Sequence, residues 1–284
     1  MPAAALVLAL TSAVSSAVWN MLLKRAGDTQ AASAVALAGG VVLFGPALAF
    51  GRIPLAAWPW IGASAACEFA YFALLVMAYE RAELSLIFPL ARGLAPVLVL
   101  FTGLLALHVR ASPGELAGIA LVAIGAVAVR GIRGIRGSRD IRVAGGLGDA
   151  GLAVLIAGCI AGYTLIDKHG VSLASPAPYF EAVLALVALP YLALVARTRG
   201  LRALRGEMRL RTIGISICLV GGYDLVLAAL RLAAAAPVAA VRESSVVIGT
   251  GLAAFVLHER VGPARWLGAC LLTAGVMVLA LAAG

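Results

Sequence analysis

The stretch PLARGLAPVLVLF, from Pro89 to Phe101, places a fully charged side chain, Arg92, inside a segment that is otherwise apolar. The stretch VAAVRESSVVIG does the same with Arg242, 150 residues further along the chain. A charge at the centre of a membrane helix costs about 2.5–3.5 kcal/mol, so it normally faces a cavity or a partner. Two such arginines therefore indicate buried polar sites, and their separation raises the possibility of a repeat.

The composition around these stretches is that of an integral membrane protein. Of 284 residues, 63% are apolar and 12% are charged, and the mean hydropathy is +1.06. Soluble domains are about 45–50% apolar and about 25% charged. The apolar runs approach the ~20 residues that a membrane-crossing helix needs, and they show no strand-like alternation. The sequence therefore predicts an all-α integral membrane protein.

Ten transmembrane helices are expected, grouped into a first repeat (1–130), a basic linker (131–147) and a second repeat (148–284). The expected spans are 3–24, 31–51, 57–79, 84–107, 114–130, 148–167, 177–196, 212–231, 234–257 and 264–282.

The loop charges predict an orientation. Of the 22 lysines and arginines, 16 fall in connections on one side of these spans, 4 fall on the other side, and Arg92 and Arg242 lie within spans. Cytoplasmic loops carry the excess of basic residues. The basic loops are therefore expected to be cytoplasmic, and both termini non-cytoplasmic, in a bacterial plasma (inner) membrane.

The same loops account for the net charge of +9 without a nucleic-acid partner. The four cysteines form no CxxC pair, and the three histidines lie at helix ends without ligand spacing. We expect no metal, no cofactor and no obligate protein partner. The expected partners are the lipid bilayer and a small-molecule substrate. An intramembrane hydrolase is disfavoured because no GxSG motif and no histidine within a span are present.

An internal duplication explains the spacing of the arginines. A shift of 150 aligns LHVRASPGELAGIALVAIG (107–125) with LHERVGPARWLGACLLTAG (257–275). A shift of 144 aligns AVWNMLLK (17–24) with AGYTLIDK (161–168). Because each unit has five spans, an odd number, the two copies are expected in opposite orientations. Such inverted repeats are typical of secondary transporters, whose substrate site lies between the halves.

Polar and aromatic residues within the spans are the candidates for that site. Paired Trp19 and Tyr163 could stack on an apolar group, while the arginines could attract a carboxylate or phosphate and the acids an ammonium or a proton. Structural roles, namely helix packing and ion pairs with an acid such as Asp224, are the alternative. The candidate substrate-binding residues are Trp19, Asn20, Glu68, Tyr71, Tyr79, Arg92, Tyr163, Thr164, Tyr223, Asp224, Arg242 and Ser244.

The repeated glycines have a different interpretation. Gly118 and Gly125 recur as Gly268 and Gly275, and both pairs are spaced by seven residues. We expect them to mark one face of the fifth and tenth spans where another helix approaches closely.

The ten spans, the matched AVWNMLLK and AGYTLIDK segments and the LHER motif before the last span resemble the drug/metabolite transporter superfamily. The closest branch is that of the EamA-type exporters, in particular the bacterial aromatic amino-acid exporters. The resemblance implies ten helices around a central cavity and export of small metabolites. It also matches Glu259 to an acid usual before the last helix of each half, where the first half has Val109.

The sequence therefore predicts a secondary active exporter, not an enzyme, that carries small amphipathic metabolites, most plausibly amino acids including aromatic ones, by alternating access. The alternative is a transporter of phosphorylated sugars or nucleotide-sugars, because two cavity arginines would suit phosphate.

Overall fold

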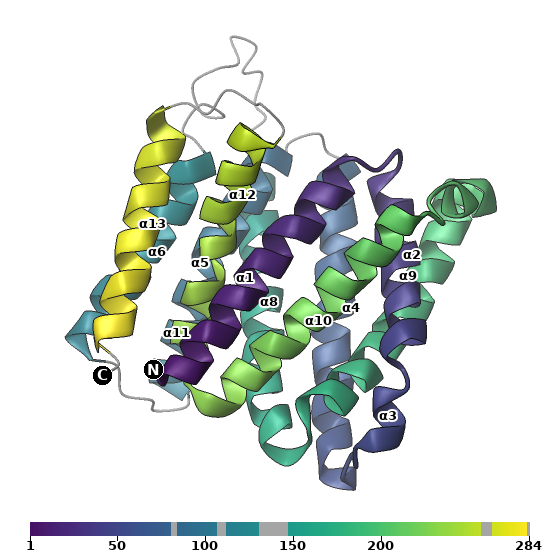
Figure 1. Ribbon diagram of the computed structural model, residues 1–284, viewed down its shortest axis with the longest axis horizontal. Coiled ribbons are helices and arrows are strands. Elements are labelled where there is room, and N and C mark those ends of the chain that lie inside the picture. Colours follow the sequence, from purple (N-terminus) through teal and green to yellow (C-terminus); the bar gives the residue numbers. More distant parts are fainter. Residues whose placement is uncertain (81–83, 107–111, 131–146, 257–262, 283–284) are drawn as a thin grey trace.

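A computed structural model describes residues 1–80, 84–106, 112–130, 147–256 and 263–282, and all regular structure in these ranges is helical (Figure 1). The first half contains α1 (Ala3–Lys24), α2 (Thr29–Phe44), α3 (Ala47–Phe50), the 3-10 turn η1 (Leu55–Ala57), α4 (Trp58–Glu80), α5 (Leu84–Ala106) and α6 (Pro113–Arg130). The second half contains α8 (Leu147–Leu173), α9 (Pro176–Gly206), α10 (Leu210–Leu232), α11 (Ala235–Arg242), α12 (Ser244–Phe255) and α13 (Pro263–Ala282).

Long apolar helices confirm that the chain is a multi-pass membrane protein. Within the ranges that the structure describes, five helical segments are long and apolar enough to cross a bilayer: 3–24, 29–49, 151–173, 176–206 and 210–232. Shorter apolar helices cover 94–105, 113–125 and 266–279. Large side chains such as Leu105, Leu189 and Leu281 are exposed on the outside, where lipid would cover them. The count of ten spans stays a prediction.

Several predicted spans differ from the helices observed. The second expected span is divided between α2 and α3, which Gly45 and Pro46 separate. The ninth expected span is divided at Glu243, so that α11 ends at Arg242 and α12 begins at Ser244. The seventh expected span continues well past residue 196, because α9 runs to Gly206 with a change of direction at Gly200. Gly200 has φ 82°, a conformation that glycine adopts without steric cost.

Helices of the first half pack against helices of the second half, and the pairs correspond between the two repeats. Matched by their order in the two repeats, α1 corresponds to α8, α2 to α9, α4 to α10, α5 to the α11–α12 pair, and α6 to α13. α1 packs against α10 just as α8 packs against α4, and α1 packs against α11 and α12 just as α8 packs against α5. The pairs α6–α13 and α2–α9 join corresponding helices directly (Figure 1). The contacts therefore have an approximate two-fold relation.

The repeated glycines lie where α6 meets α13, as their spacing predicts. A Cβ on Gly125 would lie 2.5 Å from the backbone nitrogen of Leu272 and 2.8 Å from the carbonyl oxygen of Gly268. A Cβ on Gly275 would lie 2.8 Å from the carbonyl oxygen of Gly118. Since residue numbers fall along α13 as they rise along α6, the two helices run antiparallel with their backbones in contact.

Small residues also allow α1 to pack closely against its neighbours. Ala5, Ala9, Ala13 and Ala17 recur every four residues, which places them on one face of the helix, and each is at most 3% exposed. On α10, a Cβ at Gly222 would lie 2.9 Å from the Cβ of Ser15. Because lipid is as apolar as leucine, this close packing, rather than exclusion of water, holds the helices together.

We predict that Gly125→Ala destabilises the protein by about 1–3 kcal/mol, because the added methyl group overpacks the α6–α13 contact. The melting temperature of the purified protein, measured in detergent, should fall. Gly158→Ala in α8 is the matched control, since a Cβ at that helical glycine meets nothing within 4 Å. Equal melting temperatures for the two variants would contradict a backbone contact at Gly125.

Candidate functional site

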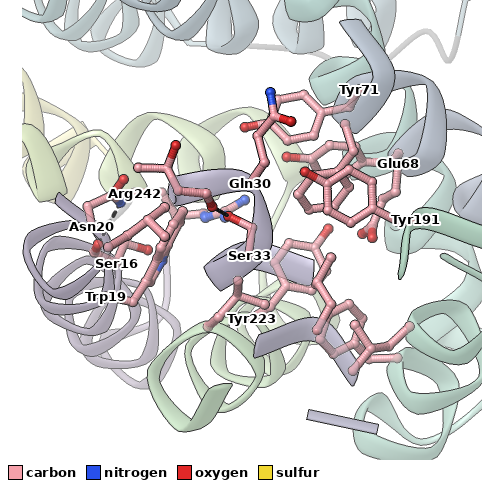
Figure 2. A pocket seen from close by; sticks show the side chains of 18 residues that line it. Ser16, Trp19, Asn20, Gln30, Ser33, Glu68, Tyr71, Tyr191, Tyr223 and Arg242 are labelled. Atoms are coloured by element: carbon pink, nitrogen blue, oxygen red, sulfur yellow. Dashed lines mark hydrogen bonds between the residues drawn. The ribbon is translucent and has the colours of Figure 1, made fainter. Parts of the chain in front are cut away.

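A cavity lies between the two halves, bounded by α1, α2, α4, α8, α9, α10 and α11 (Figure 2). Its volume is about 120 Å³. A single water molecule needs about 10–15 Å³ on the same measure, so the cavity has room for several waters or a small ligand. Four leucines line it together with two larger groups. The aromatic group is Trp19, Tyr71, Phe72, Tyr163, Phe180, Tyr191 and Tyr223, and the polar or charged group is Ser16, Asn20, Thr29, Gln30, Ser33, Glu68 and Arg242.

The aromatic side chains pack on one another around the cavity. Tyr163 lies edge-on to Tyr71 and to Tyr223, with ring centroids 6.3 Å and 6.0 Å apart. The ring of Tyr223 also contacts Phe180, at a centroid distance of 4.6 Å. Offset and edge-to-face contacts of this kind fix ring orientations. The result is a firm apolar wall that would suit the flat or aliphatic part of a ligand.

One cation and one acid line the same cavity. Arg242 is at the last position of α11, where the negative end of the helix dipole favours a cation. Its guanidinium carbon lies 5.2 Å from the ring centroid of Tyr223, within the range of a cation–π interaction. Glu68, in α4, is 8% exposed. Within the described part of the chain no ion pair joins Glu68 to Arg242, so both charges are available to a ligand.

A buried acid that sequence reasoning missed lies next to the cavity. Asp167, in α8, is 1% exposed. The hydroxyl of Tyr179 donates to its Oδ1 at 2.9 Å, and the hydroxyl of Tyr223 donates to its Oδ2 at 2.5 Å. The expected sixth span ended at residue 167, which made Asp167 its last residue, whereas α8 continues to Leu173. The signal was present as a second polar residue beside Lys168 in AGYTLIDK.

Seven of the twelve predicted site residues line the cavity: Trp19, Asn20, Glu68, Tyr71, Tyr163, Tyr223 and Arg242. The side chains of Tyr79 and Arg92 lie outside the described residues. The hydroxyl of Thr164 donates to the carbonyl of Ile160 within its own helix, at 2.7 Å. Ser244 is buried at the start of α12 and is not among the residues that line the cavity.

Asp224 does not pair with Arg242, in contrast to the suggested ion pair. It lies within electrostatic range of Glu181, in α9, and neither residue lines the cavity. Both carboxyl oxygens of Glu181 and Oδ1 of Asp224 are buried without a hydrogen-bond partner in the described ranges. Asp224 follows Tyr223 directly, so the two side chains point to different faces of α10.

Glu207 and Arg211 form hydrogen bonds with the α1–α2 connection, and we call this group of contacts the polar latch. It joins the two halves at the end of the cavity that Leu23, Thr29 and Gln30 line. Oε1 of Glu207 accepts from the backbone N–H groups of Gly27 and Asp28, at 2.8 Å and 3.0 Å. Arg211 donates to Oε2 of Glu207 at 2.8 Å and also to the carbonyl of Arg25.

The opposite end of the bundle is closed by contacts at the C-terminal ends of α8 and α10. Lys168 donates to the carbonyls of Leu230 and Ala233. The rings of Trp60 and His169 contact each other with centroids 4.1 Å apart. The cavity therefore lies towards the polar latch, and packed side chains separate it from the other end.

These features define a multi-pass membrane protein with a small-molecule site between two halves. A family model described as EamA-like transporter family matches the chain twice, over residues 3–131 and 150–281. The chain belongs to the EamA-like transporter family of the drug/metabolite transporter superfamily, whose members are transporters and not enzymes. The resemblance to this family is thereby confirmed, and so is the presence of two repeats.

One solved structure, described only as "Crystal structure of protein", has the same fold. It is 19% identical to this chain, superposes with a TM-score of 0.71, and the match covers 99% of this chain and 98% of the other. A comparison with curated proteins finds no match.

The polar latch predicts a pH-dependent stability. Burial raises the pKa of Glu207, but the N–H groups of Asp28 and Gly27 and the guanidinium of Arg211 lower it by more, so its net pKa is below the usual value. A carboxylate with a lowered folded-state pKa stabilises the protein fully above its unfolded pKa, about 4.3, and loses this effect as the pH falls through the folded-state pKa.

We therefore expect Glu207→Gln to lower the free energy of unfolding at neutral pH by about 1.5–3 kcal/mol, the range for hydrogen bonds to a charged group. The melting temperatures of the variant and of the original protein should converge as the pH falls below about 4. A difference that is the same at neutral and acid pH would rule out the ionised latch.

Proposed function

We propose that the protein is a secondary active exporter of small amphipathic metabolites, and that its substrates are amino acids, including aromatic ones. The observation that carries this proposal is the lining of the cavity. A free amino acid has a carboxylate, an ammonium group and a side chain, and the cavity offers Arg242, Glu68 and an aromatic wall to match them. Pockets of this type bind the apolar part by area and orient the ligand by a few polar groups.

The packing of corresponding helices supports alternating access by inverted repeats. α6 and α13 run antiparallel at their glycine contact. α2 and α9 do so as well, since Gln30 meets Arg199 while Gly40 meets Leu184. Two halves related in this way can rock about a site between them and expose it to each side in turn.

The proposed direction of transport rests on the basic loops. The polar latch and the basic end of α9 lie at the same end of the bundle, and we propose that this end faces the cytoplasm of a bacterial inner membrane. The cavity would then lie on the side from which an exporter collects its substrate.

Counterflow in liposomes tests the substrate class. Purified protein would be reconstituted with unlabelled amino acids inside, and the uptake of labelled ones would be measured with sugar phosphates as competitors. Exchange of aromatic or aliphatic amino acids is the expected result. Exchange of a phosphorylated solute and of no amino acid would replace the proposal with the sugar-phosphate alternative.

The role of the aromatic wall can be tested by comparing two variants, one in the cavity and one on the outside of the bundle. Alanine at both Trp19 and Tyr163 should reduce exchange of aromatic amino acids by tenfold or more, because each ring contact contributes about 0.5–1.5 kcal/mol beyond its buried area. Trp266→Ala is the control, since that ring is 45% exposed on the outer face of α13. Unchanged exchange in the double variant would exclude stacking on these two rings.

The role of Arg242 can be separated from general damage by the choice of substrate. Arg242→Gln should raise the half-saturation concentration for amino acids by about ten- to a hundredfold, since hydrogen bonds to charged groups are worth about 1.5–3 kcal/mol. Competition by the corresponding amines, which lack the carboxylate, should change little. An equal loss for both kinds of ligand would argue against a carboxylate contact at Arg242.

A further inference from the structure

The carboxylate of Asp167 forms no ion pair with a cation in the part of the chain that the structure describes. Its neighbour Lys168 donates instead to two backbone carbonyls at the end of α10. An ionised carboxyl group that is removed from water and left unpaired is strongly unfavourable, and it commonly takes up a proton.

The hydrogen bonds around Asp167 suit both of its protonation states. As a carboxylate it accepts one tyrosine hydroxyl on each oxygen, from Tyr179 and from Tyr223. A phenolic hydroxyl can donate or accept. When a proton binds one carboxyl oxygen, the new O–H can donate to a tyrosine oxygen whose own O–H has turned away. A proton can therefore bind or leave without movement of the backbone.

Tyr223 connects this acid to the substrate cavity. Its hydroxyl donates to Asp167, while its ring lines the cavity and makes a cation–π contact with Arg242. Glu68 lines the cavity too and interacts electrostatically with both Asp167 and Arg242. Two acids thus share one arginine, and this cluster is neutral only when one proton is bound.

We propose that Asp167, reached from the cavity through Tyr223, is the proton-binding site that couples export to proton entry. This inference rests on the proposed function. The ammonium group of a substrate that binds at Glu68 competes with the proton for the two acids, so the O–H bond of Asp167 breaks and the proton leaves to the same side. After the substrate is released on the other side, a proton from that side forms the O–H bond on Asp167 again. One proton enters for each substrate exported.

The described groups that face Asp167 come from four of the helices packed against α8. α4 contributes Cys67 and Glu68, α9 Tyr179, α10 Tyr223 and α11 Arg242. α5 contains one charged residue, Arg92, whose side chain lies outside the described residues, and η1 contains none. On α8 itself, Lys168 and His169 are directed to the closed end of the bundle.

The other buried acids, Glu181 and Asp224, supply the control. They too lack a hydrogen-bonded cation among the residues described, but neither lines the cavity. A proton bound there would not compete with a ligand, so Glu181→Gln should leave coupling intact.

Infrared spectroscopy tests the site without any substrate. Difference spectra of the protein in lipid nanodiscs, recorded between two pH values, should show the C=O band of a buried protonated carboxyl group. One component of this band should be lost in Asp167→Asn and kept in Glu181→Gln. A spectrum that is unchanged in Asp167→Asn would overturn the assignment. If Asp167→Asn does not fold, Asp167→Glu serves, since it should shift the band.

Transport in liposomes tests the coupling. In the original protein, a pH gradient should drive labelled amino acid to accumulate against its concentration, and a proton-conducting uncoupler should abolish this. Asp167→Asn should lose the accumulation and keep counterflow exchange, whereas Glu181→Gln should keep both. Exchange that ignores the gradient in the original protein would refute proton coupling and leave the export function standing. Absence of any amino-acid exchange would instead refute the proposed function, while the infrared result would still decide the proton site.

Discussion

A bilayer tolerates a charged side chain only where protein or water surrounds it, and the arrangement of this molecule follows from that constraint. Arg242, Glu68 and Asp167 all lie on faces of helices that turn inward, while large apolar side chains cover the outside. The helix break after Arg242 serves the same requirement, because it places the guanidinium against the end of α11 and over an aromatic ring. The cavity between the halves is thus the place where polar groups can be kept inside the membrane.

The remaining helices hold this cavity in place by contact rather than by charge. α6 and α13 meet backbone to backbone at their glycines and contribute no side chain to the cavity lining. The contact of Ser15 in α1 with Gly222 in α10 brings together two helices that do line it. Small residues therefore have two roles, one in a fixed contact at the edge of the bundle and one in the walls of the site.

The sequence was sufficient for features that repeat and insufficient for features that depend on tertiary contact. The shift of 150 related the two arginines and the glycine pairs, because duplicated helices keep the residues that their common packing needs. The shift of 144 paired Trp19 and Asn20 with Tyr163 and Thr164, and the other lining residues were predicted as polar or aromatic side chains within apolar spans. Asp167 was missed because its role depends on two tyrosines from other helices, and no local pattern marks where α8 ends. Glu207 was missed because its partners are backbone N–H groups about 180 residues away.

The two closed ends of the bundle differ in their exposure to solvent. At the polar latch, the side chain of Arg211 is 23% exposed at the start of α10, and Glu207 lies between two apolar segments. At the other end, Lys168 and Asp167 are bonded within an apolar helix. Mobile ions weaken interactions between solvent-exposed charges and hardly reach buried ones. Ionic strength therefore weakens the Glu207–Arg211 ion pair at one end of this protein and hardly affects the buried groups at the other end.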